Sequence, residues 1–267
     1  MQSLAYQNLE KILDETWLKN NLDHTYNKWI MKPADSKERM FLSRFDKYIE
    51  RVDPLLLSKT TIQNKLRNYQ NSQFTDTYYE LEVGCYLMDN GFLVDFEWKP
   101  DGENGKITPD LFVKKYNVII EIKTIHLTYQ EETGRKSGRV YELEPYKKIK
   151  DAILKEIEKY WEMEIKYPLI VIICPDFVGQ PLLPNDDFET VLEHLVSRAT
   201  LFPNGTLHFS PNVERQGLYF KDEGLQCRIL SGVGKWTGKG ILFYENPNVK
   251  ENSKIPEGRF LDILKQL

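Results

Sequence analysis

The sequence predicts a mixed α/β protein that begins with a helical region, residues 1–72. Apolar residues recur at helical spacing through this first region. From Phe74 onward the patterns follow in the order helix, three strands, helix, strand. The last of these strands, the LIVIIC run at 169–174, is apolar throughout, which is typical of a strand buried on both faces.

Composition excludes several classes of protein. With 267 residues, of which 41% are hydrophobic and 28% charged, the chain can bury a sizeable core, and it is neither disordered, collagen-like nor a coiled coil. No apolar run approaches the roughly 20 residues of a membrane helix. The N-terminus carries acidic residues early, unlike a signal peptide. Cys85, Cys174 and Cys227 lie far apart, which argues against a disulfide framework or a CxxC zinc site. We therefore expect a cytoplasmic protein with no membrane segment.

The net charge of −4 lacks the overall basic character of many nucleic-acid-binding proteins. It does not exclude nucleic acid as a partner, because an enzyme that handles phosphodiesters through metal ions keeps acidic residues in its site. A basic surface for nucleic acid would have to be local.

The N-terminal region is expected to form helices, with a break at Asp53-Pro54. It is either a helical cap on the main domain or a module that contacts a partner or DNA. Its apolar residues at helical spacing are Leu9, Ile12, Leu13, Trp17, Phe41, Phe45, Tyr48 and Ile49.

The main domain is expected to start with a helix that Thr75 caps and that Gly91 ends after Asn90. Pro145 then opens an amphipathic helix, and Pro168 ends it. The remaining expected elements are strands at 92–96, 107–113, 118–124 and 169–174, a helix at about 186–199, and short strands between 207 and 244.

Two short motifs carry the strongest chemical signal: Thr108-Pro109-Asp110 and, ten residues later, Glu121-Ile122-Lys123. Strand alternation places Glu121 and Lys123 on one face of their strand. If Lys115 and Tyr116 form the loop of a hairpin, Asp110 lies opposite Glu121, with Cβ atoms about 5 Å apart.

Two carboxylates this close repel each other unless a cation lies between them. A neighbouring lysine offsets only part of that repulsion. Carboxylates combined with water are ligands that suit Mg²⁺ or Mn²⁺. The pairing therefore predicts a divalent-metal site.

A third carboxylate is expected from the preceding helix. On a helical wheel Glu80 lies inside the apolar arc, whereas Glu82 lies on the opposite side with Asp89, where we expect solvent. A glutamate on a buried face needs a partner, so Glu80 is the better candidate. Gly84 would let this helix approach the sheet closely. The apolar arc consists of Leu81, Val83, Gly84, Leu87 and Met88.

Together these features resemble the PD-(D/E)xK nuclease superfamily, which includes restriction-type endonucleases and Holliday-junction resolvases. The resemblance covers residues 74–175 and extends to the order of the elements. It implies a restriction-endonuclease-like core (helix, three-strand meander, helix, strand) within a domain at 73–267, with a β-rich C-terminal extension. The residues that carry the resemblance are Glu80, Pro109-Asp110 and Glu121-Ile122-Lys123.

The resemblance also implies roles for these residues. Asp110, Glu121 and the carbonyl of Ile122 would hold Mg²⁺, for which Mn²⁺ can substitute. Glu80 would bind the metal directly or through water, and Lys123 would orient the attacking water and stabilise charge on the phosphate.

The implied activity is metal-dependent hydrolysis of phosphodiester bonds, with DNA the expected substrate and an endonuclease favoured over an exonuclease. Two alternatives stay open. One is an inactive module of the same fold that binds nucleic acid or protein, and the other is a nuclease for RNA or branched DNA. A homodimer is compatible with either function.

Residues 135–150 carry six basic residues against two acidic ones, next to the expected site. They are either a flap that contacts phosphates or a solvated surface. The candidates for contact with nucleic acid are Arg135, Lys136, Arg139, Lys147 and Lys148.

The GVGKWTGKG run at 232–240 resembles a phosphate-binding loop but fails its GxxxxGK[ST] pattern, and a strand pattern follows it instead of a helix. We expect a β-turn there. Structural roles are expected for His24, His126, Tyr129, His194 and His208.

Overall fold

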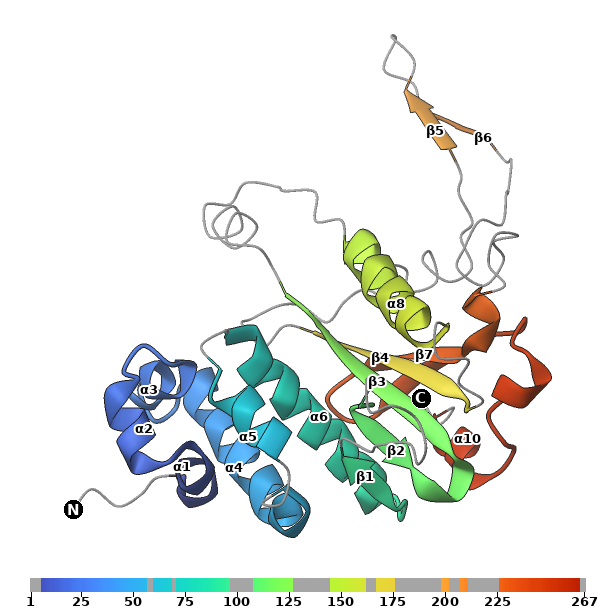
Figure 1. Ribbon diagram of the computed structural model, residues 1–267. Helices are drawn as coiled ribbons and strands as arrows, with labels where there is room; N and C mark the ends of the chain where they lie inside the picture. Colours follow the sequence, from blue (N-terminus) through green and yellow to red (C-terminus); the bar gives the residue numbers. More distant parts are fainter. Residues whose placement is uncertain are drawn as a thin grey trace. The chain divides into compact units, whose positions relative to one another are not determined.

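The computed structural model describes residues 6–56, 60–68, 71–96, 108–126, 145–161, 167–175, 198–201, 207–210 and 226–264. It confirms the mixed α/β class (Figure 1). Six strands form one open mixed sheet, in the order β1 (Val94–Phe96), β2 (Leu111–Val113), β3 (Val118–Ile125), β4 (Leu169–Pro175), β7 (Leu230–Trp236) and β8 (Ile241–Glu245). Within the described residues, no helix combines the length and apolar character of a membrane span.

The chain divides into two compact units, residues 1–124 and 125–267. The expected start of a nuclease-like domain near residue 73 stays a prediction. All of the described candidate residues at 80–123 belong to the first unit.

The first unit confirms the helical prediction for the described part of residues 1–72. An aromatic cluster forms its core: the rings of Phe41 and Tyr78 stack at 3.8 Å, and Phe45 meets Phe74 edge-on at 5.0 Å. The helices are α1 (Gln7–Leu13), α2 (Glu15–Asn20), α3 (Thr25–Ile30), α4 (Lys37–Leu56), α5 (Thr60–Leu66) and α6 (Asn71–Asp89).

Two helix boundaries were predicted wrongly. Helix α4 continues past Asp53-Pro54 to Leu56. Because Pro54 lies in the last turn, it removes a single main-chain hydrogen bond near the end of the helix instead of interrupting its middle. Helix α6 begins at Asn71, so Thr75 lies inside it. The fully buried ring of Phe74 gives this additional turn an anchor in the core.

The end of α6 is as predicted. Gly91 has a φ of 85°, in the left-handed region that favours glycine. Its N–H donates to the carbonyl of Met88 at 2.9 Å, and the N–H of Phe92 donates to the carbonyl of Leu87 at 3.1 Å. These two bonds make a Schellman motif, which ends the helix and turns the chain toward β1.

Strands β1, β2 and β3 form an antiparallel meander. The predicted hairpin register is confirmed, since Leu111 pairs with Ile120 and Val113 with Val118. Strand β2 begins only at Leu111, so Asp110 precedes it, whereas we expected the strand to include Asp110.

The turn between β2 and β3 has four residues instead of two. It consists of the 3₁₀ turn η1 (Lys114–Tyr116) and Asn117, whose φ of 53° is left-handed and which is one of the few residue types that tolerate this conformation. The turn adds one residue on each side of Lys115-Tyr116, and β2 ends at Val113 and β3 begins at Val118 as expected, so the register is unchanged.

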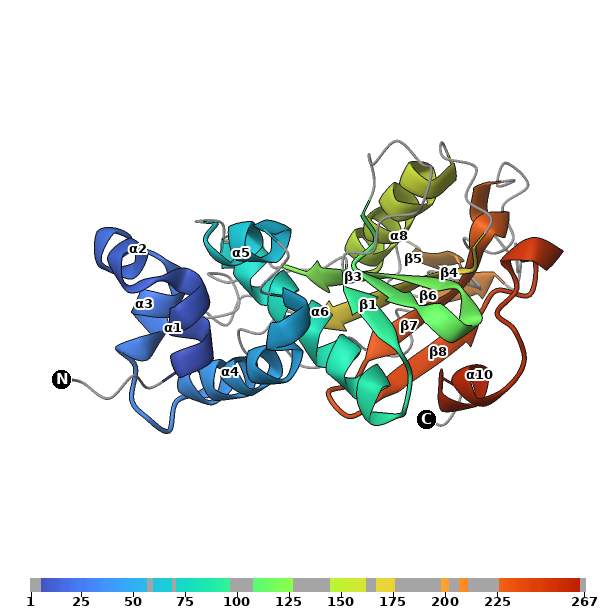
Figure 2. The ribbon, with the colours of Figure 1, turned by 60° about the horizontal axis from the view of Figure 1, so that its bottom comes forward.

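Gly84 permits a close approach between α6 and β1, as predicted. A Cβ atom at this position would lie 2.5 Å from the ring of Phe96 in β1. Figure 2 shows α6 running alongside the meander. This packing brings the N-terminal part of the helix face, including Glu80, toward the start of β2.

The second unit contains the parallel pair β4 and β7, and β8 antiparallel to β7. Helix α8 (Pro145–Trp161) is the expected amphipathic helix, and it buries one face through Ile149, Ile153, Ile157 and Tyr160. The other elements are β5 (Arg198–Leu201), β6 (Leu207–Ser210), η2 (Gln226–Ile229), η3 (Glu251–Ser253) and α10 (Arg259–Leu264).

The helix expected at 186–199 is wrong at its end. Arg198 and Ala199 lie in β5, which pairs antiparallel with β6, and residues 186–197 lie outside the described part. The turn-forming sequence Pro203-Asn204-Gly205 between the two strands favours a hairpin over a helix.

Of the glycine-rich run at 232–240, residues 237–240 form the expected turn, between β7 and β8, whereas residues 232–236 lie in β7. The N–H of Thr237 donates to the carbonyl of Gly240 at 3.0 Å, and Gly238 has a φ of 81°. A Cβ atom at Gly232 would lie 2.3 Å from the ring of Phe243 in β8. Gly232 therefore makes room for a neighbouring side chain.

Candidate active site

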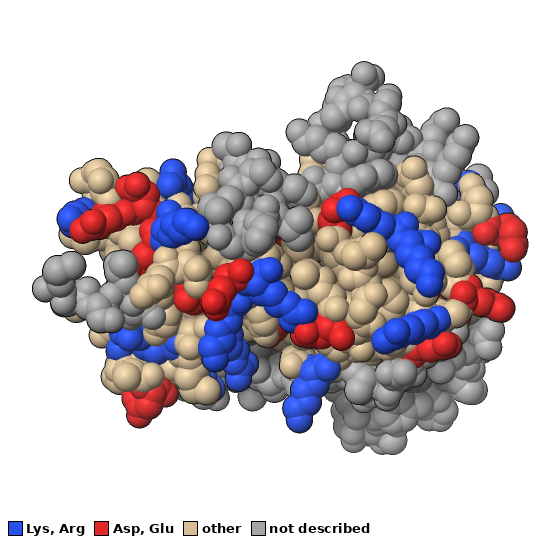
Figure 3. Space-filling view, turned by 90° about the horizontal axis from the view of Figure 1, so that it is seen from below, with Lys and Arg blue, Asp and Glu red and all other residues tan. Residues whose placement is uncertain are grey.

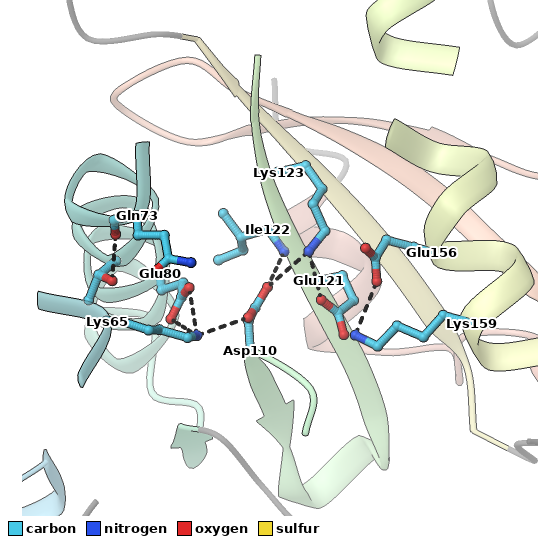
Figure 4. A network of polar contacts seen from close by, with 10 residues as sticks. Lys65, Gln73, Glu80, Asp110, Glu121, Ile122, Lys123, Glu156 and Lys159 are labelled. Carbon is cyan, nitrogen blue, oxygen red and sulfur yellow. Dashed lines mark hydrogen bonds and ion pairs between the residues drawn. The ribbon is translucent and has the colours of Figure 1, made fainter. Parts of the chain in front are cut away.

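A cavity of about 260 Å³ lies among α5, α6, the residue before β2, and β3. It brings together Glu80, Asp110, Ile122 and Lys123 of the predicted set (Figure 4). Glu121 is not part of its lining. The remaining lining residues are Lys65, Gln73, Asp76 and Thr124.

The backbone of β3 fixes the carboxylate of Asp110. Its Oδ2 accepts a hydrogen bond from the N–H of Ile122 at 2.8 Å. The ladder between β2 and β3 stops at Leu111 and Ile120, so this carboxylate extends it by one further bond. Asp110 is thereby held opposite Glu121 although it lies outside the strand.

Lys123 connects the two predicted carboxylates. Its Nζ lies 3.2 Å from Oε2 of Glu121 and 3.8 Å from Oδ2 of Asp110. The Glu121 side chain is 1% exposed and that of Lys123 is 28% exposed. The buried glutamate therefore anchors a lysine whose charge reaches the cavity.

Lys65, which the sequence did not suggest, lies between the carboxylates of Glu80 and Asp110. Its Nζ is 3.0 Å from both carboxylate oxygens of Glu80 and 3.5 Å from Oδ1 of Asp110. The five side chains form a row of alternating charge, in the order Glu80, Lys65, Asp110, Lys123, Glu121 (Figure 4). We call this arrangement the charged row.

The charged row keeps Asp110 ionised. Burial acts to raise the pKa of its carboxyl group. The positive charges of Lys123 and Lys65 and the hydrogen bond from the N–H of Ile122 outweigh burial and lower the pKa to about 2. Asp110 therefore presents an anionic carboxylate to the cavity at neutral pH.

Glu82 does not face solvent, so that prediction is wrong. Its carboxylate accepts hydrogen bonds from the hydroxyls of Tyr78 at 2.7 Å and Tyr48 at 3.2 Å. Helix α4 packs on this side of α6 and covers the face that the helical wheel assigned to water. Burial, together with the Glu82 carboxylate, raises the pKa of both tyrosine hydroxyls, which therefore remain donors.

Only Glu80 of the two glutamates reaches the cavity. Gln73, Asp76 and Glu80 lie three and four residues apart on α6, so helical spacing from Glu80 would have pointed to the other two. No comparable signal indicated Lys65, because it comes from a different helix whose packing the sequence does not specify.

The expected Mg²⁺ would need oxygen donors from the side chains that line the cavity. Among the described residues, no group of three or more His, Cys, Asp or Glu side chains is placed to hold a metal ion. Mg²⁺ in proteins commonly takes one or two carboxylates and keeps several waters. Glu80 and Asp110 already share one cation, the Lys65 ammonium, so this pair fits such an ion. The role of Glu121 as a ligand stays a prediction.

Of the candidates for nucleic-acid contact, Arg135, Lys136 and Arg139 lie outside the described residues, as does the side chain of Lys147. Lys148 donates to the carbonyl of His126 at 3.0 Å. On the face in Figure 3, the described basic and acidic side chains are interspersed. The choice between a phosphate-contacting flap and a solvated surface therefore stays open.

The geometry of the cavity and its charged row carries the functional inference by itself. Comparison of the chain with family models, with curated proteins and with solved structures finds no match.

Proposed function

We propose that the protein is a Mg²⁺-dependent nuclease with a restriction-endonuclease-like core, which hydrolyses phosphodiester bonds, with DNA as the expected substrate. The observation that carries this proposal is the convergence of Glu80, Asp110 and Lys123 on one cavity. Carboxylates from a helix and from the start of a strand meet there with a lysine from the neighbouring strand.

The chemistry divides among these side chains. Asp110 supplies an ionised oxygen ligand whose orientation the N–H of Ile122 fixes, and Glu80 presents two oxygens to the same cation position. When bound, Mg²⁺ would lower the pKa of a water ligand and neutralise the phosphate. Lys123, anchored by Glu121, directs a positive charge at the phosphate, where negative charge develops during attack.

A second candidate is a nucleic-acid-binding module of the same fold without catalysis. It is favoured by the ion pairs of the charged row, in which each carboxylate already pairs with an ammonium group, and by the lack of a group of three His, Cys, Asp or Glu side chains placed to hold a metal among the described residues. The two functions differ in whether the wild-type protein cleaves.

The test is cleavage of supercoiled, linear, single-stranded and branched DNA and of RNA in Mg²⁺ or Mn²⁺, with binding measured in Ca²⁺. We expect Lys123→Met to lower the cleavage rate by about 10²–10³-fold, the scale for losing one transition-state-stabilising group. Binding should change far less. Asp110→Asn should abolish cleavage because it removes an anionic ligand.

Lys114→Met is the matched control. Lys114 pairs with Asp95 at 3.0 Å on the same meander but does not line the cavity. Its loss should leave cleavage unchanged. Wild-type protein that binds DNA and cleaves none of the substrates would instead support the binding module, and a wild-type rate in Lys123→Met would remove this lysine from the proposed site.

A further inference from the structure

Lys65 lies at the cation position that Glu80 and Asp110 share. Its Nζ faces both oxygens of Glu80 at 3.0 Å and Oδ1 of Asp110 at 3.5 Å. The other oxygen of Asp110, Oδ2, is occupied by the N–H of Ile122. Lys65 thus pairs with the two oxygens of Glu80 and with Oδ1 of Asp110, while the backbone N–H of Ile122 bonds to the remaining oxygen, Oδ2.

These two carboxylates require a cation. Glu80 is 5% exposed and Asp110 is 8% exposed, and anions this buried are destabilising unless they are neutralised. The Lys65 ammonium, from the short helix α5, supplies a positive charge to both.

The Lys65 side chain is also able to move away from the two carboxylates. It is 27% exposed, and its charge sits on a flexible stem of four carbons. Withdrawal into the cavity would move the ammonium toward water without opening the core. The buried carboxylates, in contrast, are fixed by α6 and by the N–H of Ile122.

We propose that Lys65 is a built-in counter-ion which a divalent metal displaces, so that metal binding and the release of Lys65 are one event. This inference rests on the proposed metal site at Glu80 and Asp110. It follows that the Lys65 ammonium and the metal compete for the carboxylates of Glu80 and Asp110, so that the lysine sets the metal affinity. The coupling is reciprocal, because bound metal also weakens the ion pairs of Lys65.

The experiment measures Mn²⁺ binding by calorimetry and thermal unfolding with and without Mn²⁺, in the full chain and without nucleic acid. We expect Lys65→Met to bind Mn²⁺ about tenfold or more tightly than wild type, within the usual range of coupling between sites. In EDTA this variant should melt below wild type, because two buried carboxylates lose their counter-ion, and Mn²⁺ should remove the deficit.

Two further variants complete the set. Lys114→Met, which breaks an ion pair outside the cavity, should bind Mn²⁺ like wild type. Lys65→Arg keeps the charge and pairs with carboxylates through two donors, so it should bind Mn²⁺ more weakly than wild type. The arginine variant tests the competition even where Lys65→Met fails to fold.

The outcomes separate the two proposals. Wild-type protein that binds Mn²⁺ no more weakly than Lys65→Met, or no more tightly than Lys65→Arg, would overturn the displacement of Lys65 and leave the metal site intact. If neither wild type nor Lys65→Met binds Mn²⁺ or is stabilised by it, the metal site itself is wrong, and this inference fails with it.

Discussion

Glu80 and Glu82 are two residues apart on one helix and both are buried, yet they have different partners. Glu80 faces Lys65 and the cavity, whereas Glu82 accepts hydrogen bonds from two tyrosine hydroxyls. Burial alone therefore does not distinguish a candidate ligand from a structural carboxylate at this helix. The neighbouring donor groups distinguish them: an ammonium group at Glu80 and tyrosine hydroxyls at Glu82.

Substituting each glutamate by glutamine should separate these roles. Glu80→Gln should greatly reduce Mn²⁺ binding and cleavage, because it removes one of the two anionic ligands. Glu82→Gln should lower the free energy of unfolding by about 1–3 kcal/mol, because the two tyrosine hydroxyls lose a charged acceptor and a new amide NH₂ group is buried. Urea unfolding and cleavage per folded molecule measure the two effects. Equal loss of cleavage in both variants would contradict the assignment.

At this scale the sequence was sufficient where contacts follow from local geometry. Strand alternation and the hairpin register place Asp110, Glu121 and Lys123 together, and the structure confirms that register. The helical wheel failed for Glu82 because it assumes one buried face, and α6 is covered on two sides. Lys65 was beyond prediction, since its position depends on how α5 packs against α6.

Helix α6 is the element that sets the distance between Glu80 and the meander. Gly84 lets the helix approach until a Cβ atom would be 2.5 Å from the Cε1 and Cζ atoms of Phe96. Phe96 is almost completely buried, so its ring has little freedom to move aside.

Gly84→Ala tests this packing. Helix propensity alone would stabilise the variant by about 1 kcal/mol. The clash should cost about 1–3 kcal/mol, so we expect no net gain and a loss of up to about 2 kcal/mol in the free energy of unfolding. Phe96→Leu removes the clashing atoms, so in the double variant the alanine should cost less than it does alone. Strictly additive effects in urea unfolding would contradict the close approach.

Element ends were predictable where one residue type determines them. Gly91 ends α6 as expected because the left-handed conformation selects glycine. The start of α6 was not, since several residues near 71–75 are compatible with a cap and the burial of Phe74 decides among them; α8, in contrast, begins at Pro145 as expected. Pro54 shows the same limit, because a proline near a helix end moves the boundary by only a few residues.

At the scale of the whole molecule, 36 basic residues against 40 acidic ones give a net charge of −4. The mixed α/β class and the order of elements follow from periodicity alone. The division of the chain at residue 124 does not, because it reflects contacts between segments that no local pattern encodes.

A local basic surface would show itself in the salt dependence of DNA binding. If Lys147 and Lys148 contact phosphates, replacing both by glutamine should reduce the slope of log K against log salt by up to about two units, whatever the DNA sequence. The control is the replacement of Lys114 and Lys115 by glutamine, since these two exposed lysines are also consecutive in the sequence. An unchanged slope in the Lys147 and Lys148 variant would assign residues 147–148 to a solvated surface.

The charged row has a consequence for the order in which partners arrive. Three carboxylates against two ammonium groups leave it with one net negative charge, which repels an approaching phosphodiester. If a divalent ion takes the place of Lys65 as proposed, its two positive charges and the charges of Glu80, Asp110, Lys123 and Glu121 sum to zero, which removes this repulsion. The site would then admit nucleic acid only after it is loaded with metal, which is an ordered sequence of binding built from the spacing of five side chains.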